Sequence, residues 1–480
     1  MDSRTRHRTT EVNRREYLKG AAALTAGAVV GCSRPASHRP TVSYARELYD
    51  QGVVPIDASG WTTTRGVMPG YDALQEDVHT DVAIVGAGLA GASLALHLAQ
   101  AGVGVVVLEA RQPGWGASGR NAGHVLPILK DLEVLRQFPD GGGKFLELFR
   151  QHRSITFDLA RQHGIDCDAV QAGYLNVMRS KDTFENFGDQ AFRLEQALGL
   201  EVERLGAADV QRLTGSAYYP YGVLYKAGGR VNPYLFTNGM VSAAVRHGAS
   251  VYGESEALTL ARSGHRWWIE TGRGSVIADR VVFCTNAYPT GIMPEFGNSF
   301  YPLTAYALST KPLSAEAREI VLPSGATLAQ VPVDLNPFIV DGDGRIITSS
   351  IPSASKPEDG FWHFENHLAW IHRTWPATKG MDIELENYWT GRVAMRDREF
   401  PGVFAAQPGV FGLMHFNAWG NLMAPLMAML FAEALARDSM DQLPFPLETP
   451  QRVADRNKQS FRIRRLLVPA ARVAQKVGII

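Results

Sequence analysis

The stretch that decides the fold is DVAIVGAGLAGASLALHLAQAGVGVVVLEAR, residues 81–111. Residues 82–85 form an apolar run that predicts a buried parallel strand. Residues 89–101 carry apolar side chains at helical spacing, and residues 103–108 form a second apolar run. Strand, glycine-rich turn, helix and strand in this order predict a βαβ unit that binds a dinucleotide.

The glycines of this unit each have a physical task. Gly86 permits a tight turn, Gly88 lets the backbone approach a pyrophosphate, and Gly91 permits close packing of helix on strand. Glu109 ends the second strand, where a carboxylate accepts hydrogen bonds from ribose hydroxyls. The predicted cofactor contacts of this unit are Gly86, Gly88, Leu89, Ala90, Gly91, Glu109, Ala110 and Arg111.

Composition bounds the class of protein. The chain has 480 residues, with 48 Lys and Arg against 48 Asp and Glu, so no overall basic bias points to nucleic acid. Its three cysteines form neither a disulfide framework nor a C-x-x-C metal spacing, and we assign no metal site. We see no run of about 18 apolar residues, so no membrane-spanning helix is expected.

The N-terminal segment resembles an export signal. Arg14 and Arg15 precede a short, weakly apolar run at residues 20–31, which is typical of the twin-arginine route. The run ends in VVGC, which resembles a lipobox with Cys32 as the lipidated residue. We therefore expect a periplasmic or cell-envelope protein, with a lipid anchor at Cys32. A route that carries folded proteins favours a cofactor that stays bound, such as FAD, over an exchanging NAD.

The C-terminal segment, residues 446–480, is a basic amphipathic tail. Its last part, FRIRRLLVPAARVAQKVGII, mixes arginines with apolar residues at helical spacing. Such a helix can lie on an anionic bilayer as a peripheral membrane contact, or it can pack on its own domain. The sequence leaves both readings open.

The segment after the βαβ unit, ARQPGWGASGRNAGHVLP at residues 110–127, is rich in small residues. Its central part resembles the flavin-binding signature of the D-amino acid oxidase-like FAD oxidoreductases. Within that family the gamma-glutamylputrescine oxidoreductase branch resembles it most. The signature residues are Gly116, Ala117, Ser118, Gly119, Arg120, Asn121, Ala122 and Gly123.

The resemblance extends over roughly residues 77–440, with looser motifs such as GGRVNP at 228–233 and VVFCTNAY at 281–288. It implies FAD as cofactor, with further contacts at Thr285, Asn286, Ala287, Gly391, Asn417, Ala418, Trp419, Gly420 and Asn421. The loop at 416–420 departs from the family, since Ala418 replaces a glycine and Trp419 a smaller polar residue. Some relatives attach FAD covalently through a cysteine in the segment that corresponds to residues 391–396, and this chain has no cysteine there. Others use a histidine in the first flavin loop, where this chain has Arg120 and Asn121. We therefore expect non-covalent FAD.

The family implies oxidation of a carbon–nitrogen bond in a small-molecule amine or amino acid. A hydride equivalent passes to flavin N5, and the imine then hydrolyses in water. Candidate catalytic residues are His124, His415, Arg392, Trp419 and Tyr301, with Arg392 as a bidentate clamp for a substrate carboxylate. Each of these side chains also fits a purely structural role. The electron acceptor stays open between oxygen and a quinone or other electron carrier.

Two other functions remain at this point. One is an envelope protein that binds flavin or a partner without turnover, which the altered loop at 416–420 motivates. The other is a nicotinamide dehydrogenase, which a tightly bound yellow cofactor would eliminate.

The expected fold is α/β, with a Rossmann-like FAD-binding domain and an interleaved α+β substrate domain built on a mostly antiparallel sheet. The interleaving is implied by the resemblance. The predicted segments are 1–32 for the signal, 33–76 for an irregular arm, 77–165, 226–295 and 386–445 for the FAD domain, and 166–225 and 296–385 for the substrate domain.

Overall fold

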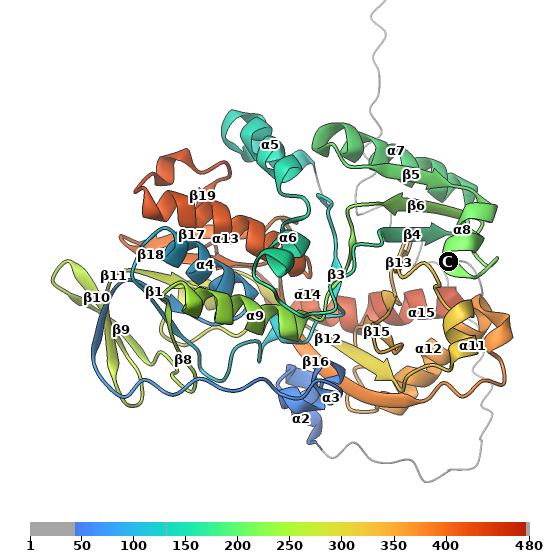
Figure 1. Cartoon of the computed structure of the whole chain (residues 1–480), viewed down its shortest axis with the longest axis horizontal. Helices are drawn as coiled ribbons and strands as arrows, with labels where there is room; N and C mark the ends of the chain where they lie inside the picture. The colour runs from blue at the N-terminus through green and yellow to red at the C-terminus, as the bar shows by residue number, and fades with distance from the viewer. Residues whose placement is uncertain (1–43, 131, 477–480) are drawn as a thin grey trace, which may run out of the picture.

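Two large β-sheets organise the chain (Figure 1). The structure is a computed structural model that describes residues 44–130 and 132–476. The predicted signal with Arg14, Arg15 and Cys32 lies outside the described residues. In strand order the first sheet is β19-β17-β18-β11-β1-β2-β8, with β10 and β9 added beside β11, and the second is β16-β12-β15-β14-β13-β4-β6-β5.

The first sheet contains the predicted βαβ unit. The centre of this sheet is parallel. β1 pairs in parallel with both β2 and β11, β2 pairs in parallel with β8, and β11 pairs in parallel with β18. The last four residues of β1 are buried, as the apolar run predicted. The strands are β1 (Val78–Val85), β2 (Val105–Leu108), β8 (Ser250–Tyr252), β9 (Thr259–Ser263), β10 (Arg266–Glu270), β11 (Ser275–Phe283), β17 (Gly402–Gln407), β18 (Val410–Met414) and β19 (Leu447–Glu448).

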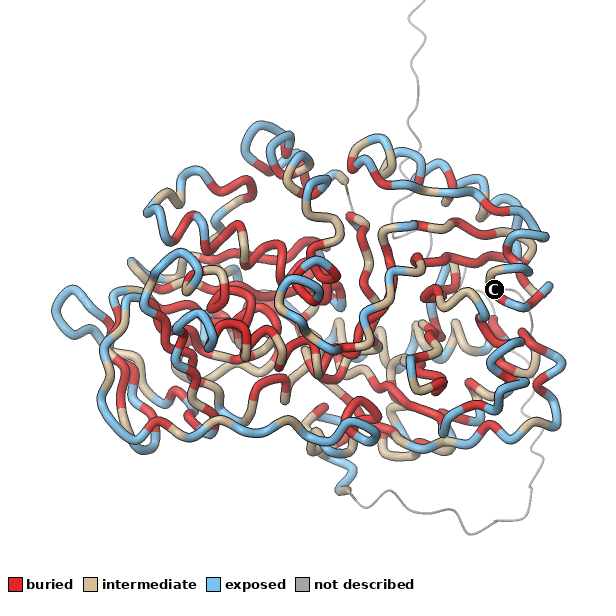
Figure 2. The backbone as a smooth tube through the Cα atoms, viewed as in Figure 1, coloured by how far each residue is buried: buried red, intermediate tan, exposed pale blue. Residues whose placement is uncertain are grey.

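Three helices pack together against this sheet and bury most of their side chains (Figure 2). They are α4 (Leu89–Gln100), α9 (Pro233–Arg246) and α13 (Gly420–Ala436), and α4 contacts both others. A helix that is apolar on nearly all sides belongs in the interior. These helices start near the cofactor loops, so their burial fixes those loops in place. Shorter elements around them are η2 (Ala117–Gly119), β3 (His124–Val125), η3 (Glu133–Gln137), η4 (Pro139–Gly142), α5 (Gly143–Gln151), α6 (Ile155–Gln162), β7 (Gly229–Arg230), α10 (Pro294–Asn298) and η6 (Met440–Gln442).

The second sheet is antiparallel except where β13 pairs with β4. Its strands are β4 (Tyr174–Met178), β5 (Val202–Leu205), β6 (Tyr221–Tyr225), β12 (Tyr301–Thr310), β13 (Thr327–Gln330), β14 (Phe338–Val340), β15 (Ile346–Ser350) and β16 (Leu385–Met395). The elements around it are α7 (Lys181–Leu198), α8 (Ala207–Thr214), α11 (Ala315–Ile320), α12 (Gly360–Thr374) and η5 (Pro376–Thr378). The predicted fold class, a parallel-sheet FAD domain with a mostly antiparallel second sheet, is confirmed.

The strands follow the predicted segments with two differences. β16 lies in the segment predicted for the FAD domain except for its first residue, Leu385, yet it pairs with β12 along its length and belongs to the second sheet. β19 lies in the predicted tail, yet it pairs with β17 in the first sheet. The domain boundaries themselves stay a prediction.

The predicted irregular arm is partly helical and partly buried. It contains α2 (Arg46–Gln51), η1 (Ile56–Ala58) and α3 (Gly60–Thr63). Tyr49, Val54 and Trp61 are buried, and the Trp61 indole N–H donates to the backbone carbonyl of Asn121 at 2.8 Å. The arm therefore helps to fix the flavin loop from outside, a role its proline-rich sequence did not reveal.

The C-terminal tail is helical over residues 456–476, where its periodicity predicted a helix. It forms α14 (Arg456–Arg462), a π-helical turn η7 (Ile463–Leu467) and α15 (Val468–Lys476), which follow one another along the second sheet (Figure 1). Among the described residues, no helix is both long enough and apolar enough to cross a membrane.

Candidate active site

A cavity of about 540 Å³ lies between the two sheets. From the first domain it is lined by the starts of α4 and α13, by the 117–124 loop and by the end of β11. From the second sheet it is lined by β4, β12, β15 and β16 and by the loop at 334–337. Of the predicted cofactor residues, the wall contains Gly88, Leu89, Ala90, Ala117, Ser118, Arg120, Asn121, Ala122, Asn286, Gly391, Ala418, Gly420 and Asn421.

The first glycine turn leaves room for a pyrophosphate at the start of α4. Gly86 has a φ of 106°, which favours glycine. A Cβ on Gly91 would lie 2.0 Å from the Gly86 carbonyl oxygen, so helix and strand approach as closely as the motif requires. A Cβ on Gly88 would meet the Ser118 hydroxyl, which accepts a hydrogen bond from the Leu89 N–H at 2.9 Å. The turn therefore places a helix N-terminus in the cavity wall, which is a favourable position for a pyrophosphate.

Glu109 lies beside the same turn, outside the cavity wall itself. Its carboxylate accepts hydrogen bonds from the N–H groups of Ala87 and Arg111 at 2.8 and 2.9 Å. Burial raises the pKa of Glu109, although these two donors oppose the shift. The geometry suits the predicted contact with a ribose, because the acid is held at the turn by the backbone.

Arg120 places a buried cation in the cavity wall. Its Nε donates to the Trp115 carbonyl at 2.6 Å, one terminal nitrogen donates to the Thr390 carbonyl at 3.2 Å, and the guanidinium stacks on the Trp115 ring. The other terminal nitrogen, Nη2, is buried and has no hydrogen-bond partner among the described residues. A buried charged donor without a partner is costly, so this nitrogen indicates that a further acceptor occupies the cavity.

Asn121 and Asn421 connect the flavin loop to the start of α13. The Asn421 amide donates to the Asn121 side-chain oxygen at 2.9 Å and to the His124 carbonyl at 2.9 Å. Asn121 also accepts from the Gly123 N–H at 2.9 Å, which closes the turn at the end of the loop. Gly123 has a φ of 80°, and a Cβ there would clash with the Val231 carbonyl oxygen.

The loop before α13 has an unusual backbone. His415, Asn417 and Ala418 all have positive φ, at 64°, 49° and 58°. Non-glycine residues in this region cost about 1–3 kcal/mol each and concentrate at functional sites. Asn417 is held by the Arg396 N–H on its side chain and by the Lys130 ammonium on its carbonyl, at 3.0 and 2.7 Å. The replacement of a family glycine by Ala418 is therefore accommodated by the surrounding bonds, and Ala418 and Gly420 still line the cavity.

The other predicted cofactor residues support the wall from behind. Asn286 has a φ of 46° and accepts the His415 N–H at 3.0 Å, while the Thr285 hydroxyl approaches the Met414 sulfur. Ala287 is buried. A Cβ on Gly116 would meet the Tyr288 ring, and a Cβ on Gly119 would meet the Gly114 carbonyl oxygen. Asn286 also lines the cavity, whereas Thr285, Ala287, Gly116, Gly119, Ala110 and Arg111 lie outside its wall.

His124 is the predicted catalytic residue that lines the cavity. Its Nε2 is buried and lacks a partner among the residues described. Burial lowers the pKa of His124 to about 4, so the ring is neutral near pH 7. A neutral imidazole facing the cavity can accept or donate one hydrogen bond without carrying charge.

His415 lies outside the wall of the cavity, so its placement does not support its predicted role. Its ring packs between Phe300 and Phe404, and its Nε2 lies 3.3 Å from the Ser299 hydroxyl. Burial lowers its pKa well below the usual range. The positive φ at this residue turns the side chain into the core, where it is a neutral structural histidine.

Arg392 and Tyr301 also lie outside the cavity wall, and for Arg392 the reason is strand geometry. Side chains alternate between the faces of a strand, and Gly391 and Val393 face the cavity. Arg392 lies between them and points to the opposite face, where it packs on Gly52 of the arm. Tyr301 is buried at the start of β12, outside the cavity wall. The placement of Arg392 does not support its prediction as a carboxylate clamp.

Trp419 contributes to the site indirectly. Its indole is buried and donates to the Leu126 carbonyl at 2.9 Å, so it fixes the loop that bears Leu126 in the cavity wall. The side chain itself lies outside the cavity wall, so its predicted direct role in the site stays a prediction.

Sequence reasoning missed two charged residues of the wall, Lys130 and Asp334. Asp334 accepts a hydrogen bond from the Gln330 N–H at 3.2 Å and opens toward the cavity. Asp334 is exposed as a residue, but the protein around its carboxylate desolvates the charged form and raises the pKa of Asp334 to about 7, against the donors of Gln330 and Asn336. Neither residue belongs to a motif, and Asp334 lies in a loop of the second domain, so only the fold brings them to the flavin loops.

The family model described as FAD dependent oxidoreductase, DAO, matches residues 81–434. The chain belongs to the DAO family of FAD-dependent oxidoreductases. The resemblance stated from the sequence is confirmed. Gamma-glutamylputrescine oxidoreductase of Escherichia coli K12 is 26% identical over 390 residues, which cover 78% of this chain and 90% of that protein. Probable oxidoreductase OrdL of Haemophilus influenzae is 25% identical, covering 77% of this chain and 85% of that protein.

Solved structures share the fold at low identity. Glycine oxidase of Bacillus cereus matches with a TM-score of 0.61 and 18% identity, over 78% of this chain and 99% of that one. L-amino acid deaminase of Proteus vulgaris matches with a TM-score of 0.64 and 19% identity, over 78% and 93% of the two chains.

FAD is the cofactor of this family, and the cavity of this chain fits it. The glycine turn leaves space at the start of α4 that a Cβ on Gly88 would narrow. The orphaned nitrogen of Arg120 needs an acceptor that the described protein does not provide. The residues that would hold FAD are therefore the turn at 86–91, Glu109, the 117–122 loop and the residues at the start of α13.

Proposed function

We propose that this FAD-dependent oxidoreductase oxidises the carbon–nitrogen bond of a small-molecule amine or amino acid. The observation that carries the proposal is the wall of the cavity, where flavin-loop residues share one space with strands of the second sheet and with three side chains able to act on a substrate, His124, Lys130 and Asp334. When bound, FAD supplies the two-electron oxidation, taking a hydride equivalent from the carbon next to nitrogen. The chain's own residues bind, orient and desolvate the substrate.

Asp334 is suited to hold the positive end of an amine. Its carboxylate faces the cavity, and above a pKa of about 7 it is ionised. A charged hydrogen bond to an ammonium group contributes about 1.5–3 kcal/mol. Asp334 therefore suits an amine or a substrate with an added cationic group, and with Arg392 on the opposite face of β16 the charged groups left in the wall for a substrate carboxylate are Lys130 and Arg120.

His124 is suited to orient the reacting nitrogen. Its ring is neutral at physiological pH, and its Nε2 has no partner in the described part of the chain. The reacting amine must be neutral before it can lose a hydride, and a neutral imidazole accepts its N–H without competing as a cation. The imine product then hydrolyses in water.

An anaerobic titration of the purified protein tests this function. The visible flavin spectrum is recorded while amines, diamines and amino acids are added one at a time. Bleaching by one compound supports the proposal and gives the substrate class. A flavin spectrum that no member of this panel bleaches, while dithionite does, would contradict the proposal and favour a flavin-binding protein without turnover.

We propose further that FAD is held without a covalent bond. Residues 391–396 contain no cysteine, and Arg120 and Asn121 occupy the loop position where some relatives carry a histidine. Acid precipitation should leave the yellow colour in the supernatant, and colour retained in the pellet would refute non-covalent binding.

The export route and the electron acceptor are proposals from the sequence alone. Arg14, Arg15 and the VVGC segment support twin-arginine export to the periplasm or envelope with lipidation at Cys32. Replacing both arginines by lysine should retain the protein in the cytoplasm, and unchanged export would refute the route.

Comparing reoxidation rates of the reduced enzyme by oxygen and by a soluble quinone identifies the electron acceptor.

A further inference from the structure

The C-terminal helix is fixed on the second domain by one of its faces. The Ser460 hydroxyl bonds to the Pro302 carbonyl, and Arg464 forms an ion pair with Asp50. Arg472 donates to the Asn336 side chain at 2.7 Å and to the Leu335 carbonyl at 2.8 Å. These bonds are spread along α14, η7 and α15, so the opposite face of the helical segment points away from the rest of the protein.

That outward face combines basic and apolar side chains. Phe461, Leu466 and Val473 are 53%, 56% and 57% exposed, which is high for large apolar residues. Residues 456–476 include seven Lys and Arg but no Asp or Glu, in a chain whose formal net charge is zero. The exposed residues recur every three or four positions, as one stripe of a helix: Lys458, Phe461, Arg462, Arg465, Leu466, Pro469, Val473 and Lys476.

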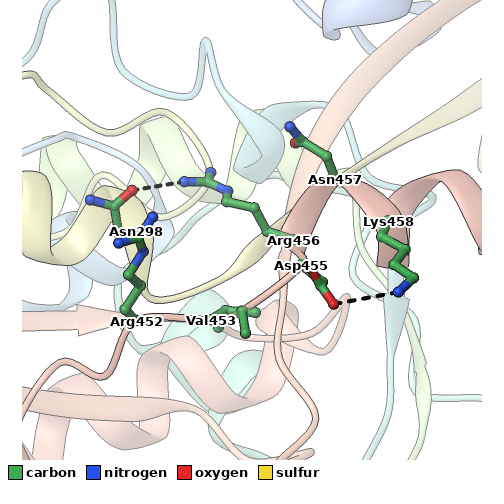
Figure 3. Close-up of a pocket in the computed structure, with 8 residues that line it drawn as sticks. Asn298, Arg452, Val453, Asp455, Arg456, Asn457 and Lys458 are labelled. Carbon is green, nitrogen blue, oxygen red and sulfur yellow. Dashed lines mark hydrogen bonds and ion pairs between the residues drawn. The ribbon is translucent and has the colours of Figure 1, made fainter.

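A cationic hollow of about 680 Å³ lies at the start of this helix (Figure 3). Arg452, Arg456 and Lys458 line it with Asn298, and its one acid, Asp455, lies 3.6 Å from the Lys458 ammonium. Arg456 is held in place, because it donates to the Gly297 carbonyl at 2.7 Å and stacks over Phe300. The hollow is therefore built to receive negative charge next to the exposed stripe.

We propose that this outward face binds the surface of an anionic phospholipid bilayer. The hollow takes a lipid phosphate, the basic residues of the stripe face the headgroups, and Phe461, Leu466 and Val473 enter the interface. Exposed apolar side chains between arginines fit a surface that is charged outside and apolar beneath, which neither nucleic acid nor a small anion offers. The proposal does not rest on the oxidation chemistry.

Vesicle co-sedimentation tests the proposal with the full chain carrying Cys32→Ala, so that no lipid anchor contributes. We expect binding to vesicles of equal phosphatidylcholine and phosphatidylglycerol, weak binding to phosphatidylcholine alone, and loss of binding as salt rises. The double variant Arg462→Glu, Arg465→Glu should bind at least about tenfold more weakly. Phe461→Ser with Leu466→Ser should also weaken binding, because the apolar contribution is lost.

A matched control lies on α7, where Phe192 is 50% exposed and Arg193 is exposed. Phe192→Ser with Arg193→Glu should leave vesicle binding unchanged, and all variants should retain the flavin content of the parent. The proposal is overturned if anionic and neutral vesicles bind equally, if the stripe variants bind like the parent, or if the control loses as much. It is also overturned if the protein binds inorganic phosphate but no vesicle.

Discussion

The side chains of Asn121 and Asn421 hydrogen-bond to each other although 300 residues separate them in sequence. One belongs to the loop that follows the βαβ unit, and the other begins α13 near the C-terminal end of the family region. The pair therefore joins the first and last flavin segments, and the shape of the cavity depends on the position of each segment relative to the other.

Replacing Asn421 by Leu should weaken FAD binding. The change removes three bonds of the Asn421 side chain, to Asn121 and to the His124 carbonyl, and a bond of this kind contributes about 1 kcal/mol. We expect the FAD dissociation constant to rise about tenfold or more, measured by fluorescence of released flavin. Asn186→Leu, at an exposed position of α7, is the control. An unchanged dissociation constant for Asn421→Leu would show that the pair does not hold the site.

Replacing Gly91 by Ala tests the close contact of α4 with β1. The new Cβ would lie 2.0 Å from the Gly86 carbonyl oxygen, so the helix start must shift. We expect a loss of about 2 kcal/mol or more in the free energy of unfolding, together with loss of FAD. Gly102→Ala is a useful comparison, because no atom lies within 4 Å of its Cβ position but its φ is 79°. It should lower stability through backbone strain yet keep FAD. Retained FAD and stability in Gly91→Ala would contradict the geometry.

The βαβ unit could be predicted because its signals are local. The apolar runs, the three glycines and Glu109 follow one another within residues 81–111. Their tasks concern contacts inside the same unit, such as Gly91 against Gly86 and Glu109 against Ala87. Such short-range constraints can be read from spacing alone.

The substrate side could not be predicted in the same way, since it depends on which face a strand presents. Arg392 follows a family glycine, but a shift of one residue along β16 moves a side chain to the other face. His415 has a positive φ and its ring packs between Phe300 and Phe404, a placement that no sequence signal indicates. Asp334 carries no sequence signal, and it reaches the cavity through the packing of two distant segments. Motif reasoning thus found the cofactor residues better than the catalytic ones.

Replacing Asp334 by Asn should change both substrate affinity and pH dependence. The carboxyl of Asp334 has a pKa of about 7, so its negative charge appears as pH rises through neutrality. We expect kcat/KM for a cationic amine to rise over this range in the parent, and this rise to be absent in the variant. The loss at pH 8 should be about tenfold to a hundredfold, mostly in KM.

The same assay with Asp382→Asn, at an exposed position before β16, controls for a general change in charge. Both variants must retain FAD for the comparison to hold. A pH profile in Asp334→Asn that matches the parent would show that another group titrates, and would remove Asp334 from the substrate site.

Acid should destabilise the protein through its buried histidines. Burial lowers the pKa of His363 to about 4, and its Nε2 accepts the Ser353 N–H at 2.9 Å, which requires the neutral ring. Between pH 6.5 and 4 the unfolded chain binds more protons at this residue than the folded chain does. The free energy of unfolding therefore falls as pH decreases through this window, by up to about 3 kcal/mol from this histidine.

His363→Gln should therefore flatten the decline in stability between pH 6.5 and 4, even if the variant is less stable at pH 7. Chemical denaturation at several pH values measures the slope for parent and variant. His265→Gln, at the exposed turn between β9 and β10, should leave the slope unchanged. Because His97 and His124 also have a pKa lowered to about 4, a residual slope is expected in His363→Gln. A slope equal to that of the parent would show that His363 does not contribute to the acid sensitivity, and would contradict the lowered pKa and the neutral ring.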